Sequence, residues 1–314
     1  RRLAWRGQVS NKHDRRQQMA IPLQRRRLSS GVRELEDDLM DILQKAEHFF
    51  QSNGRDIDRA IFHHHFGDLD QAGLLAVLGR YQNEDGGFWG LEVDIAAPES
   101  NPFATELALH LCLQANVPGG HPLLQKTALY LENTQSEDGD WHFSDAIYQA
   151  DLAPWFQGWR WPTLNPACTT AGLLRELGLG SERLHQRVEQ LFQQMANVAD
   201  LTSDQFYAVR PYAFYFLPEW DHPQRPFYLS GLVWWLIRQH VDSKLSDSGH
   251  FFEYVRRPQT AVGRQLPSDI LETRLSALAS EQMADGGWPS PYGDGWRGWI
   301  TAQNLVTLRL FGRI

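Results

Sequence analysis

The chain of 314 residues carries a net charge of −8, and its 42% hydrophobic residues are enough for a substantial buried core. It contains no run of about 18 apolar residues that could span a bilayer, and its two cysteines do not indicate a disulfide framework. It also lacks a Gly-rich phosphate loop, a nucleophile elbow and zinc-knuckle spacing, so nucleotide chemistry is not indicated. We therefore expect a cytoplasmic globular protein.

The first 28 residues differ from the rest in charge. They hold nine Lys or Arg against one acid, Asp14, and this net +8 leaves −16 on the remaining chain. We predict a basic, disordered arm over residues 1–29 and one folded domain over residues 30–314. The alternatives are an arm that contacts anionic lipid or nucleic acid, and an Arg-rich transit peptide.

Two motifs near the start of the predicted domain resemble metal sites. Asp37-Asp38-Leu39-Met40-Asp41 spells the magnesium–diphosphate motif of class I terpene synthases. It falls in the first turns of a predicted helix, where acids favour the helix dipole, and the second metal motif of that class is missing. His63-His64-His65 are consecutive, and consecutive helical residues point about 100° apart and cannot all bind one ion. Neither motif is therefore expected to hold a metal.

One short motif occurs three times, with the spelling Gln-x-x-Asp-Gly-x-aromatic. The copies are Gln82–Phe88, Gln135–Trp141 and Gln282–Trp288. The first two start 53 residues apart and the last two 147, close to three steps of 49, which predicts two unmarked units between them. Each Gly ends a helix by accepting positive φ, the aromatic plugs the joint between units, and the Gln amide is expected to lie on that ring. Each copy thus predicts the turn of a helical hairpin.

Helical spacing of apolar residues flanks the first copy, from Leu74 to Tyr81 and from Phe103 to Leu113. Only short pieces such as Phe251 to Val255 alternate with period two, so we expect no large sheet. The predicted fold class is all-α, with ten helices in five hairpins. The other predicted helices span residues 33–52, 121–134, 165–178, 182–197, 203–217, 226–241, 267–283 and 299–311.

Two carboxylates directly follow the first repeat turn. Glu92 and Asp94 are separated by one residue in a Gly- and Pro-bounded loop, so both can face the same side of an extended segment. Close carboxylates split their pKa values, which would leave one proton-holding acid at neutral pH. The alternative is a helix cap or a pair with an Arg. Glu106 on the next helix would complete the patch if its face turned inward, and would otherwise be structural.

A long loop over residues 142–164 holds a second cluster. Asp145, Tyr148 and Asp151 precede four aromatic residues within seven positions. Aromatic faces stabilise carbocations, stack on sugars or fill a core, and long ordered loops often form binding walls. The candidate catalytic residues are Glu92, Asp94, Asp145 and Asp151. The candidate ligand-contacting residues are Trp89, Glu106, Trp155, Trp159, Trp161, Asn165, Trp296, Arg297 and Trp299.

The three turns resemble the Gln-Trp repeats of squalene–hopene cyclases, and the hairpin plan resembles the α/α toroid of those cyclases and of protein prenyltransferase β subunits. More closely, residues 38–314 resemble bacterial single-domain proteins with prenyltransferase and squalene-cyclase-type repeats. The resemblance implies an α/α toroid, a barrel of about five to six helical hairpins. It is carried by Tyr81-Gln82-Asn83 with Asp85-Gly86-Gly87-Phe88, Gly90-Leu91-Glu92-Val93-Asp94, Ala153-Pro154-Trp155, Asn165-Pro166, Asp285-Gly286-Gly287-Trp288 and Trp296-Arg297-Gly298-Trp299.

The chain departs from both known chemistries of that fold. Class II terpene cyclases protonate an alkene with an Asp-x-Asp-Asp run, which is missing here, and no position matches the Asp, Cys and His zinc ligands of protein prenyltransferases. Cys112 and Cys168 with His110, His142 or His250 could supply a thiolate and imidazole set. We predict no cofactor, with zinc or magnesium as the weaker alternative.

The leading hypothesis is an isoprenoid-processing, terpene-cyclase-like enzyme. Its central cavity would bind a hydrophobic or amphipathic small molecule, with acid catalysis by Glu92 or Asp94. The alternatives are a carbohydrate-active enzyme, favoured by a polar cleft with carboxylates about 5–10 Å apart, and a non-catalytic binding module, favoured by a cavity without convergent acids. The sequence leaves the oligomeric state open.

Overall fold

The computed structural model describes residues 41–314 apart from 245–247. The basic arm over residues 1–29 and the first four residues of the Asp37–Asp41 motif lie outside the described residues. Most of the described chain is helical, and its strands are the two-residue β1 (Ile95–Ala96) and β2 (Asp151–Leu152), which pair antiparallel. The prediction of an all-α chain is confirmed for this part of the protein.

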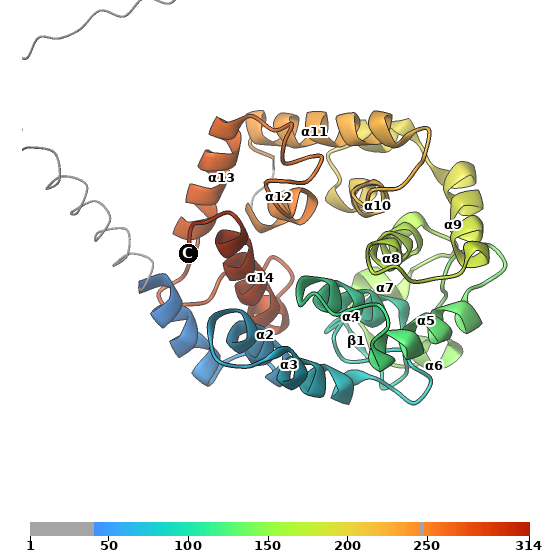
Figure 1. Ribbon diagram of the computed structural model, residues 1–314, viewed down its shortest axis with the longest axis horizontal. Helices are drawn as coiled ribbons and strands as arrows, with labels where there is room; N and C mark the ends of the chain where they lie inside the picture. The colour runs from blue at the N-terminus through green and yellow to red at the C-terminus, as the bar shows by residue number, and fades with distance from the viewer. Residues whose placement is uncertain (1–40, 245–247) are drawn as a thin grey trace, which may run out of the picture. The chain divides into compact units, whose positions relative to one another are not determined.

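Long helices alternate along the chain between an inner and an outer row (Figure 1). The outer row begins with helix 41–52 and continues with α3 (Gln71–Leu78), α5 (Pro122–Thr134), α9 (Glu182–Met195), α11 (Arg225–Val241) and α13 (Ser268–Ser280). The inner row consists of α2 (Asp56–Phe66), α4 (Pro102–Gln114), α8 (Leu164–Glu176), α10 (Phe206–Phe216), α12 (Ser248–Val255) and α14 (Arg297–Leu310). Each outer helix is thus followed by an inner one.

The glutamine of each repeat turn bonds to two backbone carbonyls. The Gln82 side-chain amide donates to Gly86 O at 3.0 Å within its own turn, and to Leu123 O at 3.0 Å in the first turn of α5. The other copies repeat this pattern, from Gln135 to Gly139 and Leu184 and from Gln282 to Gly286 and Ile42. The expected role of the amide was a contact with the aromatic ring. The structure shows instead that its donors satisfy carbonyls at the turn and on the next outer helix.

The repeat glycines let the turn backbone touch that helix. Gly86, Gly139 and Gly286 have φ of +93°, +96° and +90°. A Cβ atom on them would lie 2.3, 2.4 and 1.8 Å from a carbonyl oxygen of α5, α9 and helix 41–52, respectively. Any side chain here would therefore force successive outer helices apart. The third copy joins the end of α13 to helix 41–52, so the first and last parts of the described chain are neighbours.

The aromatic residue of each repeat is buried, as the motif predicts. Phe88, Trp141 and Trp288 are at most 2% exposed. Both indoles also donate a hydrogen bond, from Trp141 Nε1 to Leu131 O at 2.9 Å and from Trp288 Nε1 to Leu278 O at 2.7 Å. Each ring therefore ties its turn back to the outer helix that precedes it.

The helix predictions were incomplete in two places. The connections from α9 to α10 and from α11 to α12 are the two unmarked units between the second and third repeats, as the spacing predicted. However, α2 was not expected, and the alternation at Phe251–Val255 wrongly suggested a strand where α12 lies. Phe251, Phe252, Tyr254 and Val255 are all buried. A run of five residues is too short to distinguish the period of a strand from that of a helix, which explains the error.

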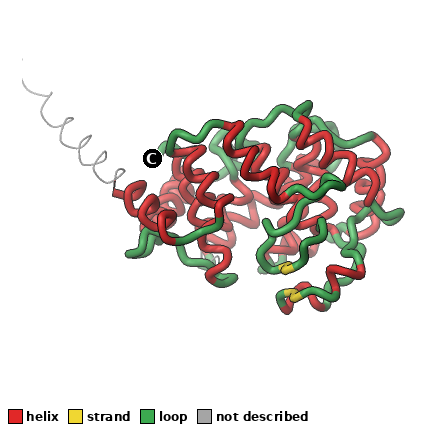
Figure 2. The backbone as a smooth tube through the Cα atoms, turned by 90° about the horizontal axis from the view of Figure 1, so that it is seen from below, coloured by secondary structure: helices red, strands yellow, loops and turns green. Residues whose placement is uncertain are grey.

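The long loop after the second repeat folds into a small lobe. It contains the short helices α6 (Asp145–Tyr148) and α7 (Pro154–Gln157) and strand β2, which pairs with β1. Figure 2 shows the two strands at the lower edge of the helical body. The lobe has its own hydrophobic cluster of Ile95, Ala97, Phe103, Phe143, Ile147, Leu152 and Phe156. This packing places the β1 segment, which directly follows Asp94, against the start of α4.

We predict that Trp288→Ala destabilises the protein by roughly 3–5 kcal/mol, because it removes a fully buried ring and its hydrogen bond from a helix joint. Urea unfolding measures this change. Trp155→Ala is the matched control, since Trp155 is 49% exposed, and it should cost about 1 kcal/mol or less. An unchanged free energy of unfolding in Trp288→Ala would contradict the structural role of the repeat.

Candidate functional site

A cavity of about 760 Å³ lies among inner helices α4, α8, α10, α12 and α14. One end of the cavity is lined by residues at or just before the N-termini of these inner helices. There the Trp296 indole hydrogen-bonds to Asp94, and the Tyr292 hydroxyl hydrogen-bonds to His250. The other end is lined by residues at the C-termini of these helices. There Glu176, the last residue of α8, forms an ion pair with Arg256, which directly follows α12. We call the first the acidic end, because it holds Glu92 and Asp94, and the second the basic end, because it holds Arg256 and Arg257.

At the acidic end, three chain segments fix the carboxylate pair. The Asp94 backbone N–H donates to Glu92 Oε1 at 3.1 Å, and Trp296 Nε1 donates to Asp94 Oδ2 at 2.8 Å. The Asp94 carbonyl accepts from Ala153 N at 2.9 Å, which anchors it to the lobe. Both carboxyl groups line the cavity, and Glu92 is only 8% exposed.

Burial shifts the protonation of this pair. The pKa of Glu92 is raised from 4.5 to about 8, mainly by burial and also by the nearby charges of Asp94 and Glu106, against the hydrogen bond from the Asp94 backbone. Burial also raises the pKa of Asp94, while hydrogen bonds from Trp296 and Glu92 oppose that rise. Glu92 therefore holds a proton at neutral pH. Repulsion between the two carboxylates, the cause suggested by the sequence, ranks below desolvation.

An arginine in the middle of the cavity binds two carboxylates. Arg210 donates through Nη2 to Glu106 Oε1 at 2.6 Å and through Nε to Glu253 Oε1 at 2.7 Å. It also donates through Nη1 to Asn165 Oδ1 at 3.0 Å. Glu106 and Asn165, both candidate ligand residues, thus do face the cavity, but their carboxylate and amide oxygens are already bonded. The second carboxylate oxygen of Glu106, Oε2, is buried and has no hydrogen-bond partner among the described residues.

Aromatic candidates form the wall of the acidic end. Trp155, Trp159, Trp296 and Trp299 all line the cavity. Trp299 is 8% exposed and Trp155 is 49% exposed, so the wall extends from the buried interior to the surface. Trp159 packs edge-on against Phe103 with ring centroids 5.2 Å apart.

Three candidate residues of the lobe do not reach the cavity. Asp145 and Asp151 are exposed to solvent and are not among the residues that line it. Trp161 stacks on His142 at 5.2 Å between ring centroids and donates to Tyr148 Oη at 2.7 Å. Trp161 packs against the lobe's own hydrophobic cluster, which contains the neighbouring Ile147.

Two further candidates belong to the fold rather than to the cavity. Arg297 donates to both carboxylate oxygens of Asp285, at 2.9 and 2.8 Å, and to Trp288 O at 3.1 Å, so it holds the third repeat turn. Trp89 is 37% exposed and lies beside Tyr81, with ring centroids 6.2 Å apart. Neither residue lines the cavity.

Sequence reasoning missed Arg210 and Arg256, and it named His110 only as a possible zinc ligand. A usable signal existed for Arg210, which is the only charged residue of α10, in the otherwise apolar and aromatic sequence Phe206–Phe216. A charge buried in such a helix needs a partner or a function. Burial, with the charges of Arg256 and Arg210, lowers the pKa of His110 to about 3, so this cavity residue is a neutral imidazole.

The candidate zinc ligands are poorly suited to that role. Burial raises the pKa of Cys112 to about 12 and that of Cys168 well above its ordinary value, which keeps both as thiols. Within residues 41–244 and 248–314, no group of three or more His, Cys, Asp or Glu side chains could hold a metal ion.

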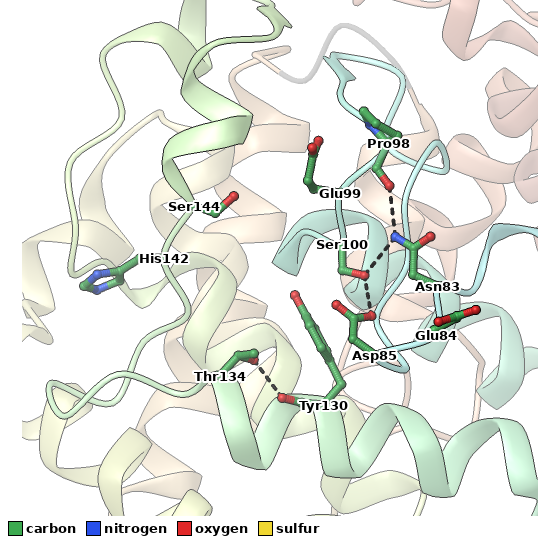
Figure 3. A pocket seen from close by; sticks show the side chains of 10 residues that line it. All are labelled: Asn83, Glu84, Asp85, Pro98, Glu99, Ser100, Tyr130, Thr134, His142 and Ser144. Carbon is green, nitrogen blue, oxygen red and sulfur yellow. Dashed lines mark hydrogen bonds between the residues drawn. The ribbon is translucent and has the colours of Figure 1, made fainter.

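A second hollow of about 610 Å³ lies beside the first repeat turn (Figure 3). Its polar groups bond to one another. Ser100 Oγ donates to Asp85 Oδ1 at 2.7 Å, and Asn83 Nδ2 donates to Pro98 O at 2.9 Å. Because these contacts hold the turn against the segment that enters α4, we assign this hollow a structural role.

In the part of the chain that the structure describes, no helix is both long and apolar enough to cross a bilayer. Comparisons of the chain with protein-family models, with curated proteins and with solved structures found no match. The geometry and charge of the cavity are therefore the features from which we infer a function.

We predict that Glu92→Gln becomes progressively more stable than the wild type as pH rises. Between about pH 4.5 and 8 the folded wild type keeps the Glu92 proton while the unfolded chain loses it. Wild-type stability therefore falls with pH across this window, by at most roughly 1.4 kcal/mol per pH unit. Gln does not titrate and removes this loss.

Urea unfolding of both proteins at pH values from about 5 to 9 measures the difference. Glu137→Gln serves as the control, because Glu137 is exposed, and its difference from wild type should not change with pH. A constant difference for Glu92→Gln across the window would show that Glu92 has an ordinary pKa.

Proposed function

We propose that the described helices form an α/α toroid. Two observations support this proposal. The chain alternates between inner and outer helices, and the third repeat turn bonds to helix 41–52 through the same contact that joins the other outer helices. Inner helix α14 also contacts inner helix α2. A closed ring of this kind would explain why the cavity is lined by helices from most of the chain.

We further propose that this cavity converts an isoprenoid or a similarly apolar, amphipathic small molecule by proton transfer. The observation that carries the proposal is a buried carboxyl, Glu92, at the aromatic end of the cavity, where burial raises its pKa to about 8. Its volume of about 760 Å³ is in the range of pockets that enclose small molecules. A carboxyl kept neutral at the cost of folding stability is a mark of a functional site.

In the proposed mechanism, Glu92 donates its proton to a substrate oxygen. A pKa of about 8 suits transfer to a leaving or ring oxygen near neutral pH, whereas an isolated alkene demands a much stronger acid. As the C–O bond breaks, its electron pair stays on the protonated oxygen and positive charge develops on carbon. The faces of Trp159, Trp296 and Trp299 stabilise that charge, and the Asp94 carboxylate, fixed by Trp296, adds a counter-charge.

The contact between Glu92 and Asp94 weighs against the carbohydrate alternative. Pairs of carboxylates that cleave glycosidic bonds stand about 5–9.5 Å apart, with room for a sugar carbon or a water between them. Here Glu92 and Asp94 are two residues apart, and the Asp94 backbone N–H donates to Glu92 Oε1 at 3.1 Å, so the two carboxyl groups lie on one short segment rather than on opposite sides of a cleft. The convergence of acids at the acidic end likewise weighs against a purely non-catalytic binding module.

We expect Asp94→Asn to reduce turnover by about 100-fold or more while leaving stability equal or higher. Asn can still accept the hydrogen bond from Trp296, and the substitution removes a charge next to Glu92. The assay presents prenyl diphosphates, linear triterpenes that carry an oxygen function, and oligosaccharides in parallel. Asp151→Asn is the matched control, because Asp151 is exposed and outside the cavity, and it should keep wild-type activity.

Two outcomes would reject the proposal. One is an Asp94→Asn variant that is less stable but keeps full specific activity on the substrate that the wild type accepts. The other is a wild-type protein that turns over the oligosaccharides, or none of the three classes.

A further inference from the structure

The basic end of the cavity contains an arginine in an unusual backbone conformation. Arg256 follows the last residue of α12, and its φ of +58° lies in the left-handed region that glycine favours. Its backbone N–H donates to Phe252 O at 2.8 Å and so ends the helix. Glycine would form this helix end without strain. An arginine here therefore suggests that the side chain itself is needed.

The guanidinium of Arg256 is fixed but only partly satisfied. Its Nη1 donates to Glu176, and the group lies over the Phe214 ring at 4.3 Å from the centroid. Its Nε and Nη2 atoms are buried and have no hydrogen-bond partner within the described residues. Buried donors normally find partners, because leaving a charged donor unpaired is costly. The two N–H groups lie on the same edge of the guanidinium and point in parallel, which matches two oxygens of one carboxylate or phosphate.

The charged groups around Arg256 favour the binding of an anion. The cavity carboxylates Glu106 and Glu253 are paired with Arg210, and Glu176 is paired with Arg256 itself. Arg257 lines the same end and forms no ion pair with a described residue. An acidic group bound between the two arginines would thus meet net positive charge.

We propose that Arg256 anchors the acidic head group of the cavity ligand through Nε and Nη2. Helix α12 has eight residues and spans roughly 12 Å, so a head group at the basic end directs the apolar chain past Phe214 towards Glu92. The ligand class is a molecule with a carboxylate or phosphate head, an apolar chain and an oxygen function at the far end. This inference rests on the proposed function for the role of Glu92, while the anchoring itself is a statement about binding.

The test measures binding of three probes of equal chain length, dodecanoate, dodecyl phosphate and dodecan-1-ol, by isothermal titration calorimetry. The wild type should bind the two anions roughly 10- to 100-fold more tightly than the alcohol, as expected for a charge-assisted pair of hydrogen bonds. Arg256→Met should abolish this preference. Arg264→Met is the matched control, because Arg264 is exposed and outside the cavity, and it should keep the preference.

A second variant guards against misfolding. Arg256→Gly suits the positive φ and so relieves backbone strain, yet it also removes the guanidinium. It should fold and bind all three probes with similar affinity. Equal affinity of the wild type for the three probes, as expected if water satisfies the two donors, would overturn the proposal. Retention of the anion preference in a folded Arg256→Gly variant would overturn it as well.

The outcome is separable from that of the proposed function. Asp94→Asn should bind the probes like the wild type, since Asp94 lies at the opposite end of the cavity. If the anion preference depends on Arg256 while no turnover is found, the proposed chemistry fails and the anchor stands. If the wild type turns over an isoprenoid but shows no anion preference, the anchor alone is wrong.

Discussion

The side-chain amide of the repeat glutamine is the contact on which the helical body depends. In each copy it joins a turn carbonyl to a carbonyl of the next outer helix, and the glycine of the same turn allows the two backbones to touch. The outer row is thereby held through its own polar joints and buried aromatic rings. The inner helices need not meet at the centre, and a cavity of about 760 Å³ remains between them.

The separation between the outer helices, which the repeat turns join, and the inner helices, which line the cavity, explains how the cavity tolerates so much buried charge. At the cavity wall, Arg210 is paired with Glu106 and Glu253, and burial favours the neutral forms of Glu92 and His110. Pairing buried charges and keeping buried groups neutral both cost folding free energy relative to a core filled with apolar side chains. A scaffold in which inner helices pack against their neighbours and outer helices are joined by the repeat turns can carry this cost. We infer that the polar wall was retained for binding and chemistry rather than for stability.

Local features of the site could be predicted from the sequence, and long-range ones could not. The repeat turn is complete within seven residues, and Glu92 and Asp94 are two apart, so spacing alone brought each group together. Arg210 meets Glu106 across 104 residues and Glu253 across 43, distances at which no pattern in one sequence indicates contact. Arg297 was misinterpreted as a ligand residue because its carboxylate partner belongs to the neighbouring repeat turn.

The central claim is that Glu92 carries a proton at neutral pH inside the cavity. Infrared spectroscopy of the protein with ¹³C-labelled glutamate measures this directly, because protonated and ionised carboxyl groups absorb at different frequencies. At about pH 7 we predict a protonated glutamate band that titrates near pH 8, is absent in Glu92→Gln and persists in Glu137→Gln. A spectrum in which the Glu92 carboxyl is already ionised at about pH 6 would contradict the account.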